Sequence, residues 1–136
     1  MRETAMKDEE YQARPIACTE APLAYPLVYL HDPSVTLDAW LDFVRRRTSG
    51  DGTGLIEFRD RADIIHALFA YRVDFDIQGQ RQLCIAQLIV AQIPGSQIDR
   101  SLVACIDRLK AQLGCRSIAI EQPFQVPLPP TAVPAA

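Results

Sequence analysis

Apolar residues recur along this chain at two spacings, and each spacing predicts a different kind of element. Spacings of three and four residues, as in Leu37, Trp40, Leu41 and Val44, place side chains on one face of a helix. Alternation in steps of two, sustained over residues 64–77, predicts a strand with one buried face. The chain therefore combines helices with strands, and we expect an α+β fold.

The N-terminal part of the chain shows little periodicity. Residues 1–22 are polar and irregular, and we expect a flexible segment there. Residues 27–30 are apolar and lie between Pro26 and Pro33, which cannot sit in the central ladder of a strand. This bracketing predicts a short strand at 27–30, and we expect the ordered domain to occupy residues 23–122.

A helix is predicted from Thr36 to Arg47. The Thr36 hydroxyl is suited to cap its N-terminus, and Arg45, Arg46 and Arg47 complement the negative end of its dipole. These arginines could bind an anion, although cations are usual at a helix C-terminus without any ligand. A glycine-rich break then leads to a second strand at 55–58.

A long hairpin is predicted next, with arms at Ile64–Ile77 and Gln80–Ile93. Residues 64–71 taken alone would also suit a helix. The alternation continues to Ile77, however, with β-branched and aromatic residues on the apolar face. Gln78 and Gly79 would form a two-residue turn, because glycine reaches a positive φ without strain.

The clearest local prediction is an amphipathic helix from Gln97 to Leu113. Its buried stripe is expected to contain Ile98, Leu102, Ile106, Leu109 and Leu113. Ser96 and Asp99 have the spacing of a capping box, and Gly114 permits a left-handed end to the helix. A short apolar strand is predicted immediately afterwards, at 117–120.

The order strand, strand, turn, helix, strand over residues 64–121 resembles the acyl-CoA-binding core of the GNAT superfamily of N-acyltransferases. The resemblance covers about 27–121 and implies a mixed, mostly antiparallel sheet with flanking helices. The strands at 83–90 and 117–120 should pair in parallel, because a helix connects them by a right-handed crossover. The family's usual C-terminal elements have no counterpart, since 123–136 is a proline-rich tail expected to be extended or disordered.

The resemblance also implies a site for acetyl-CoA or another acyl-CoA. In that family a turn before the helix presents backbone N–H groups to the pyrophosphate, which the positive end of the helix dipole favours. Here the turn corresponds to Gly95, Ser96, Gln97 and Ile98, the candidate cofactor-binding residues. Gln97 and Asp99 stand where the family has glycines, and the Asp99 carboxylate would repel a pyrophosphate. Weak binding is therefore expected.

Few residues are suited to acid–base catalysis of acyl transfer. The tyrosine that the family carries after its last core strand has no counterpart here. His66 and Glu121 are the remaining candidates for a catalytic base, and both could equally be solvated residues at strand edges or ends. His31 and Asp32 are expected in a turn before the first helix.

Composition narrows the classes of partner. A length of 136 residues suits one domain, and a net charge of −3 gives no sign of a nucleic acid or an anionic membrane as partner. The longest apolar run, 83–93, is too short to cross a bilayer, and residues 1–10 lack the apolar segment of a signal peptide. We therefore expect a cytoplasmic protein.

The 4 cysteines and 2 histidines form no pattern of close ligand pairs, so no metal is expected.

Three classes of function stay open. The first is an acyl-CoA-dependent N-acyltransferase of reduced size, and the second is a GNAT-like fold without catalysis that serves as an interaction or regulatory module. The third is an unrelated α+β interaction domain, such as a small acidic chaperone. An open edge at 117–120 would favour association through that strand, either with a second copy as a homodimer or with another protein.

Overall fold

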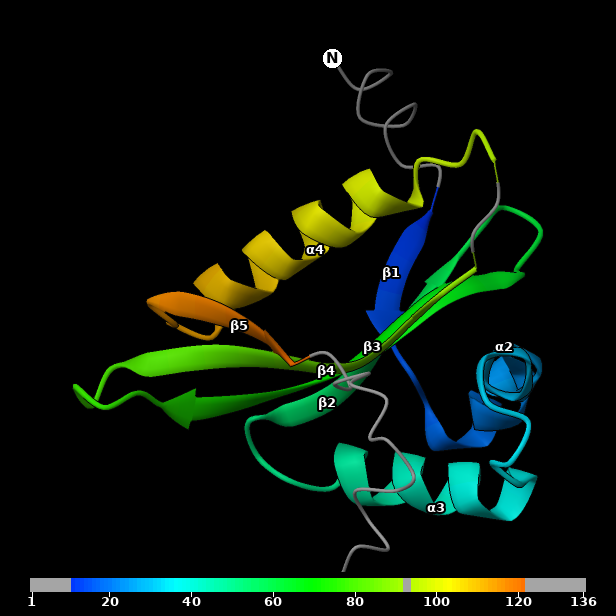
Figure 1. Cartoon of the computed structure of the whole chain (residues 1–136), viewed down its shortest axis with the longest axis horizontal. Coiled ribbons are helices and arrows are strands. Elements are labelled where there is room, and N and C mark those ends of the chain that lie inside the picture. Colours follow the sequence, from blue (N-terminus) through cyan, green and yellow to red (C-terminus); the bar gives the residue numbers. More distant parts are fainter. Residues whose placement is uncertain (1–10, 92–93, 122–136) are drawn as a thin grey trace, which may run out of the picture.

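The computed structural model describes residues 11–91 and 94–121. Its elements in chain order are β1 (Gln12–Pro15), the 3-10 helix η1 (Cys18–Ala24), α2 (Tyr25–His31), α3 (Leu37–Thr48), β2 (Thr53–Arg59), β3 (Ile65–Phe75), β4 (Arg81–Val90), α4 (Ile98–Gln112) and β5 (Ser117–Glu121). Figure 1 shows a twisted sheet with α4 across one face and α2 and α3 on the opposite side. The predicted α+β fold is confirmed.

The five strands form one sheet in the order β1-β2-β3-β4-β5. The pairs from β1 to β4 are antiparallel, whereas β4 and β5 are parallel, with Leu83 opposite Ile118. The predicted parallel pairing is confirmed, and α4 provides the crossover between the two strands. Residues 123–136, and the tail predicted for them, lie outside the described residues, as do residues 1–10.

The β3–β4 hairpin is confirmed, with a connection longer than the predicted two-residue turn. The Asp76 N–H donates to the Gln80 carbonyl at 2.9 Å, so three residues form the loop between them. Gly79 has a φ of +78°, as a three-residue loop with a left-handed last position requires. The Asp76 side chain stabilises this loop further, because its Oδ1 accepts hydrogen bonds from the amides of Gln78 and Gln80.

The prediction of a strand at 27–30 is wrong, because these residues lie in the helix α2. Pro26 occupies the first turn of this helix, where a missing N–H removes no helical hydrogen bond. Leu27 and Val28 are buried on the side of the sheet that α2 and α3 cover. The proline thus starts a helix instead of bounding a strand.

The irregular chain expected over residues 1–22 is also corrected, since residues 12–15 pair with β2 as the edge strand β1. Partly buried ion pairs contact this segment. Glu57, which is fully buried, accepts hydrogen bonds from Arg59 at 2.7 Å and Arg14 at 3.2 Å. Glu20 accepts from the same two arginines, at 2.9 Å and 3.1 Å. Contacts of this kind link positions far apart in the sequence, which periodicity does not reveal.

Each face of the sheet carries its own hydrophobic core. The core under α4 includes the predicted stripe residues Leu102, Ile106 and Leu109, packed on Phe58 and Phe69 of the sheet. The core on the opposite side joins α2 and α3 to the sheet, and its buried members include Val28, Trp40, Val44, Leu68 and Ile89. The predicted caps hold in two places: Thr36 accepts the Ala39 N–H, and Gly114 ends α4 with a φ of +67°.

Candidate functional site

The turn between β4 and α4 carries the four residues predicted to bind a cofactor. Gly95 has a φ of +81°, and a Cβ at this position would meet no atom within 4 Å. Gln97 is the N-cap of α4, and Asp99 lies in the first turn of the helix. The turn is therefore open beside Gly95 and stands at the positive end of a helix dipole, with one carboxylate nearby.

The Ser96 side chain connects this turn to the start of β1. Its Oγ lies 3.0 Å from the Tyr11 hydroxyl and accepts a hydrogen bond from the Ile98 N–H, also at 3.0 Å. This bond replaces the predicted capping box, in which Ser96 would accept from the amide of Asp99. Because its N–H is already bonded and its side chain is buried, Ile98 is the least suited of the four candidates to contact a ligand.

His66 packs behind Tyr11, with the two rings edge to face at a centroid distance of 5.0 Å. Its Nε2 lies 2.7 Å from Oδ2 of Asp60, whose Oδ1 accepts the amides of Ala62 and Ile64. These bonds, that from Ile64 most of all, hold the pKa of Asp60 below its usual value. The His66 side chain is only 13% exposed. It is thus part of a half-buried pair and not a fully solvated edge residue.

A β-bulge places His66 in this position. Phe58 pairs with Ala67 and Arg59 with Ile65, so His66 is an extra residue on β3. A bulge of this kind redirects a side chain that strict alternation would point elsewhere. The structure therefore brings one catalytic candidate close to the predicted cofactor turn through Tyr11, which the spacing in the sequence did not indicate.

Glu121, the other catalytic candidate, lies apart from this group at the end of β5. Both of its carboxylate oxygens accept hydrogen bonds from the Arg72 guanidinium, at 3.0 Å and 2.6 Å. The hydrogen bonds from Arg72 lower the pKa of Glu121. A carboxylate that is ionised and bonded in this way is a weak proton acceptor, so its clearest role is to bridge β5 to β3.

On the α2 and α3 side of the sheet, a cavity of about 390 Å³ opens between these helices and the strands β3 and β4. Seven of its eleven lining residues are apolar: Val28, Val35, Ala39, Trp40, Phe43, Leu68 and Ile89. Its polar lining residues are His31, Asp32, Arg46 and Gln87. An apolar cavity with a few convergent polar groups is the usual form of a small-molecule site. The sequence analysis did not identify this site.

Gln87, on the cavity wall, has a φ of +51°. The β3–β4 register shifts beside it, since Ala70 faces Ala86 while Leu68 faces Ile89. A positive φ in a residue other than glycine is uncommon and marks a local strain that often accompanies function. In the sequence, the only sign of this strained position is a polar residue inside an apolar run.

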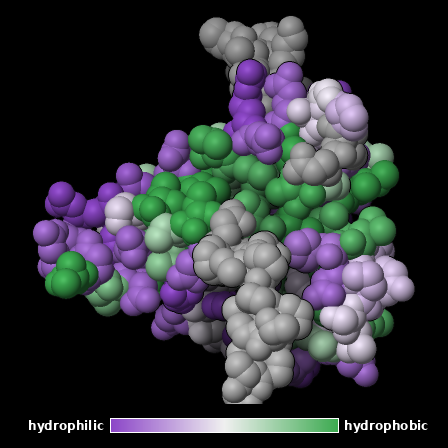
Figure 2. Space-filling model, viewed as in Figure 1, coloured by the Kyte–Doolittle hydropathy of each residue, from purple (hydrophilic) through white to green (hydrophobic). Residues whose placement is uncertain are grey.

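The last β4–β5 pair among the described residues is Ala86 with Glu121, where the described range itself ends. Residues 87–90 of β4 follow this pair. Leu88 and Val90 in this stretch are half-buried. Figure 2 shows hydrophobic residues gathered across the middle of this face, between α4 and the helices α2 and α3.

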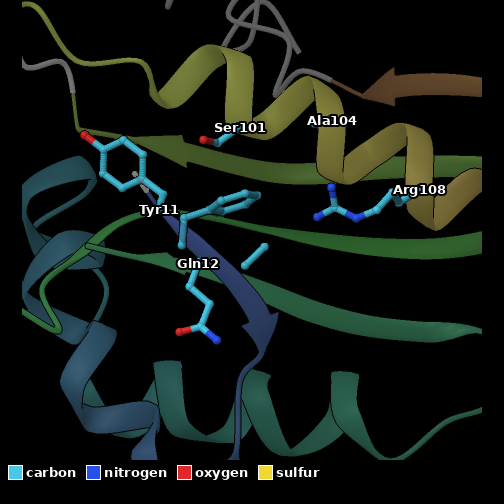
Figure 3. Close-up of a pocket in the computed structure, with 7 residues that line it drawn as sticks. Tyr11, Gln12, Ser101, Ala104 and Arg108 are labelled. Carbon is cyan, nitrogen blue, oxygen red and sulfur yellow. The ribbon is translucent and has the colours of Figure 1, made fainter. Parts of the chain in front are cut away.

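A second, smaller hollow of about 150 Å³ lies between β1 and α4 (Figure 3). Tyr11 and Arg108 stand at its opposite ends, with Ser101 and Ala104 on the α4 side. Arg108 is the one charged residue among those that line it. The hollow thus lacks a carboxylate or an imidazole suited to acid–base catalysis and is a weaker candidate than the larger cavity.

In the described part of the chain, no group of three or more His, Cys, Asp or Glu side chains is arranged to hold a metal ion. Among the helices of residues 11–91 and 94–121, none has the length and apolar character needed to cross a membrane.

Comparison with known proteins gives a result for the structure only. No protein-family model matches the sequence, and no curated protein matches it either. Solved structures do match. A GNAT family acetyltransferase from Staphylococcus aureus superposes with a TM-score of 0.71 at 13% identity, covering 82% of this chain and 86% of that one.

Two more matches are of the same kind. The ribosomal-protein-alanine N-acetyltransferase from Brucella melitensis gives a TM-score of 0.67 at 12% identity, covering 86% of this chain and 83% of that one. The aminoglycoside N-acetyltransferase AAC(6')-Iy in complex with CoA gives 0.69 at 14% identity, covering 92% and 82%. These matches, all under 25% identical, show that this chain has the fold of the GNAT N-acetyltransferases.

Proposed function

We propose that this protein is an N-acyltransferase that uses an acyl-CoA as acyl donor and binds its acceptor amine in the cavity beside Gln87. One observation carries the proposal. A residue of β4 with a positive φ, a shift in the β3–β4 register and the lining of a cavity coincide at Gln87. A donor lying along β4 and an acceptor in the cavity would meet at this point.

The residues of the turn fit an acyl-CoA in part. Gly95, Ser96 and Gln97 would hold the pyrophosphate through backbone N–H groups at the start of α4, where the helix dipole favours an anion. Asp99 opposes this, because its carboxylate lies in the first helical turn. The Ile98 N–H contributes less than the sequence predicts, since it bonds to Ser96. The binding of CoA by a structural neighbour supports the donor class.

When bound, an acyl-CoA would supply a thioester whose C–S bond breaks as the amine nitrogen bonds to the acyl carbon. An acceptor that enters as an ammonium first loses one proton to become nucleophilic, and the second amine proton passes to the released thiolate. His31 is the imidazole of the cavity and is our candidate to accept the first of these protons. Asp32 is suited to bind a cation, because hydrogen bonds from Ser34 lower the pKa of its carboxyl.

Calorimetric titration with acetyl-CoA tests the donor site. We expect weak binding by the parent protein, and Asp99→Asn should strengthen it about threefold to tenfold, because one repulsive charge leaves the turn. Asp107→Asn, an exposed change farther along α4, is the matched control and should have no effect. Failure of the parent and of Asp99→Asn to bind acetyl-CoA would contradict the proposal and favour a non-catalytic module.

A second measurement tests the acceptor site. Thiol release from acetyl-CoA should depend on an added amine and should fall at least tenfold in His31→Gln, if His31 accepts the proton. Exposed His31 makes few packing contacts, so the thermal midpoint of this variant should match the parent. Amine-dependent release that is unchanged in His31→Gln would remove His31 from the mechanism.

A further inference from the structure

We propose that the acceptor is an amino acid with an apolar or aromatic side chain, bound in the Gln87 cavity through its ammonium, its carboxylate and its side chain. The inference rests on the proposed function only in taking this cavity as the acceptor site. Three features of the cavity carry it: an apolar wall, one ionised carboxylate and a surplus of arginine.

The apolar wall selects the side chain of the acceptor. Trp40, Leu68 and Ile89 are buried in the core and present carbon surface to the cavity. The Trp40 ring stacks on Phe43 at a centroid distance of 6.0 Å, and its Nε1 donates to the Ala21 carbonyl at 2.8 Å. Because the only polar atom of this indole is already bonded, the wall favours an apolar or aromatic group.

Asp32 provides the anionic group of the cavity. The Ser34 hydroxyl and N–H donate to it at 2.7 Å and 3.1 Å, and both bonds are to Oδ1. Within the described part of the chain, no hydrogen bond involves Oδ2. A carboxylate held in place on one oxygen and free on the other is suited to bind an ammonium group.

The last turn of α3 provides the cationic group. Arg45 and Arg46 both pair with Asp42, the latter at 2.6 Å, while the Arg47 guanidinium lies 5.5 Å from the centre of the Phe43 ring. Two of these guanidinium groups share the Asp42 carboxylate and the third lies over an aromatic ring, so the last turn of α3 carries more cationic than anionic groups. Of the three, Arg46 lines the cavity itself. A guanidinium binds a carboxylate through two parallel hydrogen bonds.

These charges also exclude other acceptors. A polycationic aminosugar would find one carboxylate, Asp32, among the lining residues and would be repelled by the arginines. An amine without a carboxylate would give Arg46 no new partner. The volume of about 390 Å³ is within the range of small-molecule sites and suits a single amino acid.

Three ligands that share a phenyl ring test the proposal by calorimetry in the absence of acyl-CoA. L-Phenylalanine carries both charged groups, phenethylamine lacks the carboxylate and 3-phenylpropanoate lacks the ammonium. We expect L-phenylalanine to bind about tenfold more tightly than either, because each lost charge removes one charge-assisted bond. Equal affinity for L-phenylalanine and phenethylamine would overturn the proposal.

Two variants with matched controls locate the charges. Arg46→Gln should weaken L-phenylalanine binding about tenfold and leave phenethylamine binding unchanged. Arg45 also pairs with Asp42 but does not line the cavity, so Arg45→Gln should change the binding of neither ligand. Asp32→Asn should weaken both amines, with the exposed Asp38→Asn as control. Identical effects of Arg45→Gln and Arg46→Gln would contradict a carboxylate site at Arg46.

The outcomes separate this inference from the proposed function. Selective binding of L-phenylalanine without any binding of acetyl-CoA would support the inference and contradict the transferase. Binding of acetyl-CoA with no preference among the three phenyl ligands would support the transferase and overturn the inference.

Discussion

At the scale of single residues, Tyr11 links the two parts of the α4 side of the sheet that carry candidate chemistry. Its hydroxyl contacts Ser96 of the cofactor turn and its ring contacts His66. Neither contact follows from the sequence, since Ser96 lies 85 positions away. Tyr11 therefore connects the start of β1 to the turn before α4.

Replacing Tyr11 by Phe should test this link. The variant keeps the ring packed on His66 and loses the hydroxyl, so the free energy of unfolding should fall by about 1 kcal/mol. Ser96→Ala removes the same hydrogen bond, and the double variant should therefore cost less than the sum of the two single ones. Urea unfolding measures all three, with the exposed Tyr29→Phe as control. Strict additivity would contradict a direct Tyr11–Ser96 bond.

The Asp60–His66 pair predicts a pH dependence of stability. Since the pKa of Asp60 is lower in the folded protein than the ordinary 3.8, its ionised form adds stability above that value. This contribution is lost as the pH falls through the folded pKa. Asp60→Asn should therefore show a smaller loss of stability on acidification below about pH 4 than the parent. Asp51→Asn, in an exposed loop, should behave as the parent does, and urea midpoints at successive pH values provide the measurement.

At the scale of elements, α4 is a helix whose two sides differ clearly in solvent exposure. Leu102, Ile106 and Leu109 are buried against the sheet, while Val103 is 62% exposed on the outer side. The Schellman end of the helix is complete, because the Cys115 N–H donates to the Lys110 carbonyl at 3.0 Å. The position of α4 thus depends on its apolar stripe and on its ends together.

Ile106→Ala should lower the free energy of unfolding by about 2–5 kcal/mol, since it leaves a cavity in the core below α4. Val103→Ala removes a similar side chain from the same helix and should cost less than about 0.5 kcal/mol, because Val103 faces solvent. Chemical denaturation compares the two. A melt of Ile106→Ala indistinguishable from the parent would show that this stripe is not the core.

At the scale of the whole molecule, β5 forms one side of the sheet. Within the described residues it pairs with β4 alone, and Ile120 is 51% exposed. A strand edge of this kind favours association unless something covers it. The molecule therefore combines a proposed cavity site on one side with a candidate association surface at β5.

Sedimentation should reveal a dimer that Ile120→Lys converts to a monomer, because a charge at the strand edge opposes pairing with a second copy. Ile77→Lys places the same charge in the fully exposed hairpin loop and should leave the dimer intact. A parent protein that sediments as a monomer over the accessible concentrations would contradict this prediction.

The sequence by itself determines the elements whose pattern is long and local. The alternation over β3, the apolar run of β4 and the stripe of α4 are each long enough to define an element, although the alternation does not show that residues 67–70 are buried on both faces of the sheet. The order of these elements then restricts the topology, because a helical crossover between two strands of one sheet has a single preferred hand. This is why the GNAT-like core was predictable without any matching sequence motif.

Only the tertiary structure decides the features that join distant residues. β1 pairs with β2 through the backbone and through the Arg14–Glu57 ion pair, and His66 contacts Tyr11 because of a register shift against β2. The cavity at Gln87 needs α2, α3 and two strands at once. Such features depend on pairing and packing between elements, which leave no period in the sequence. The fold could therefore be inferred from the chain alone, whereas its candidate acceptor site could not.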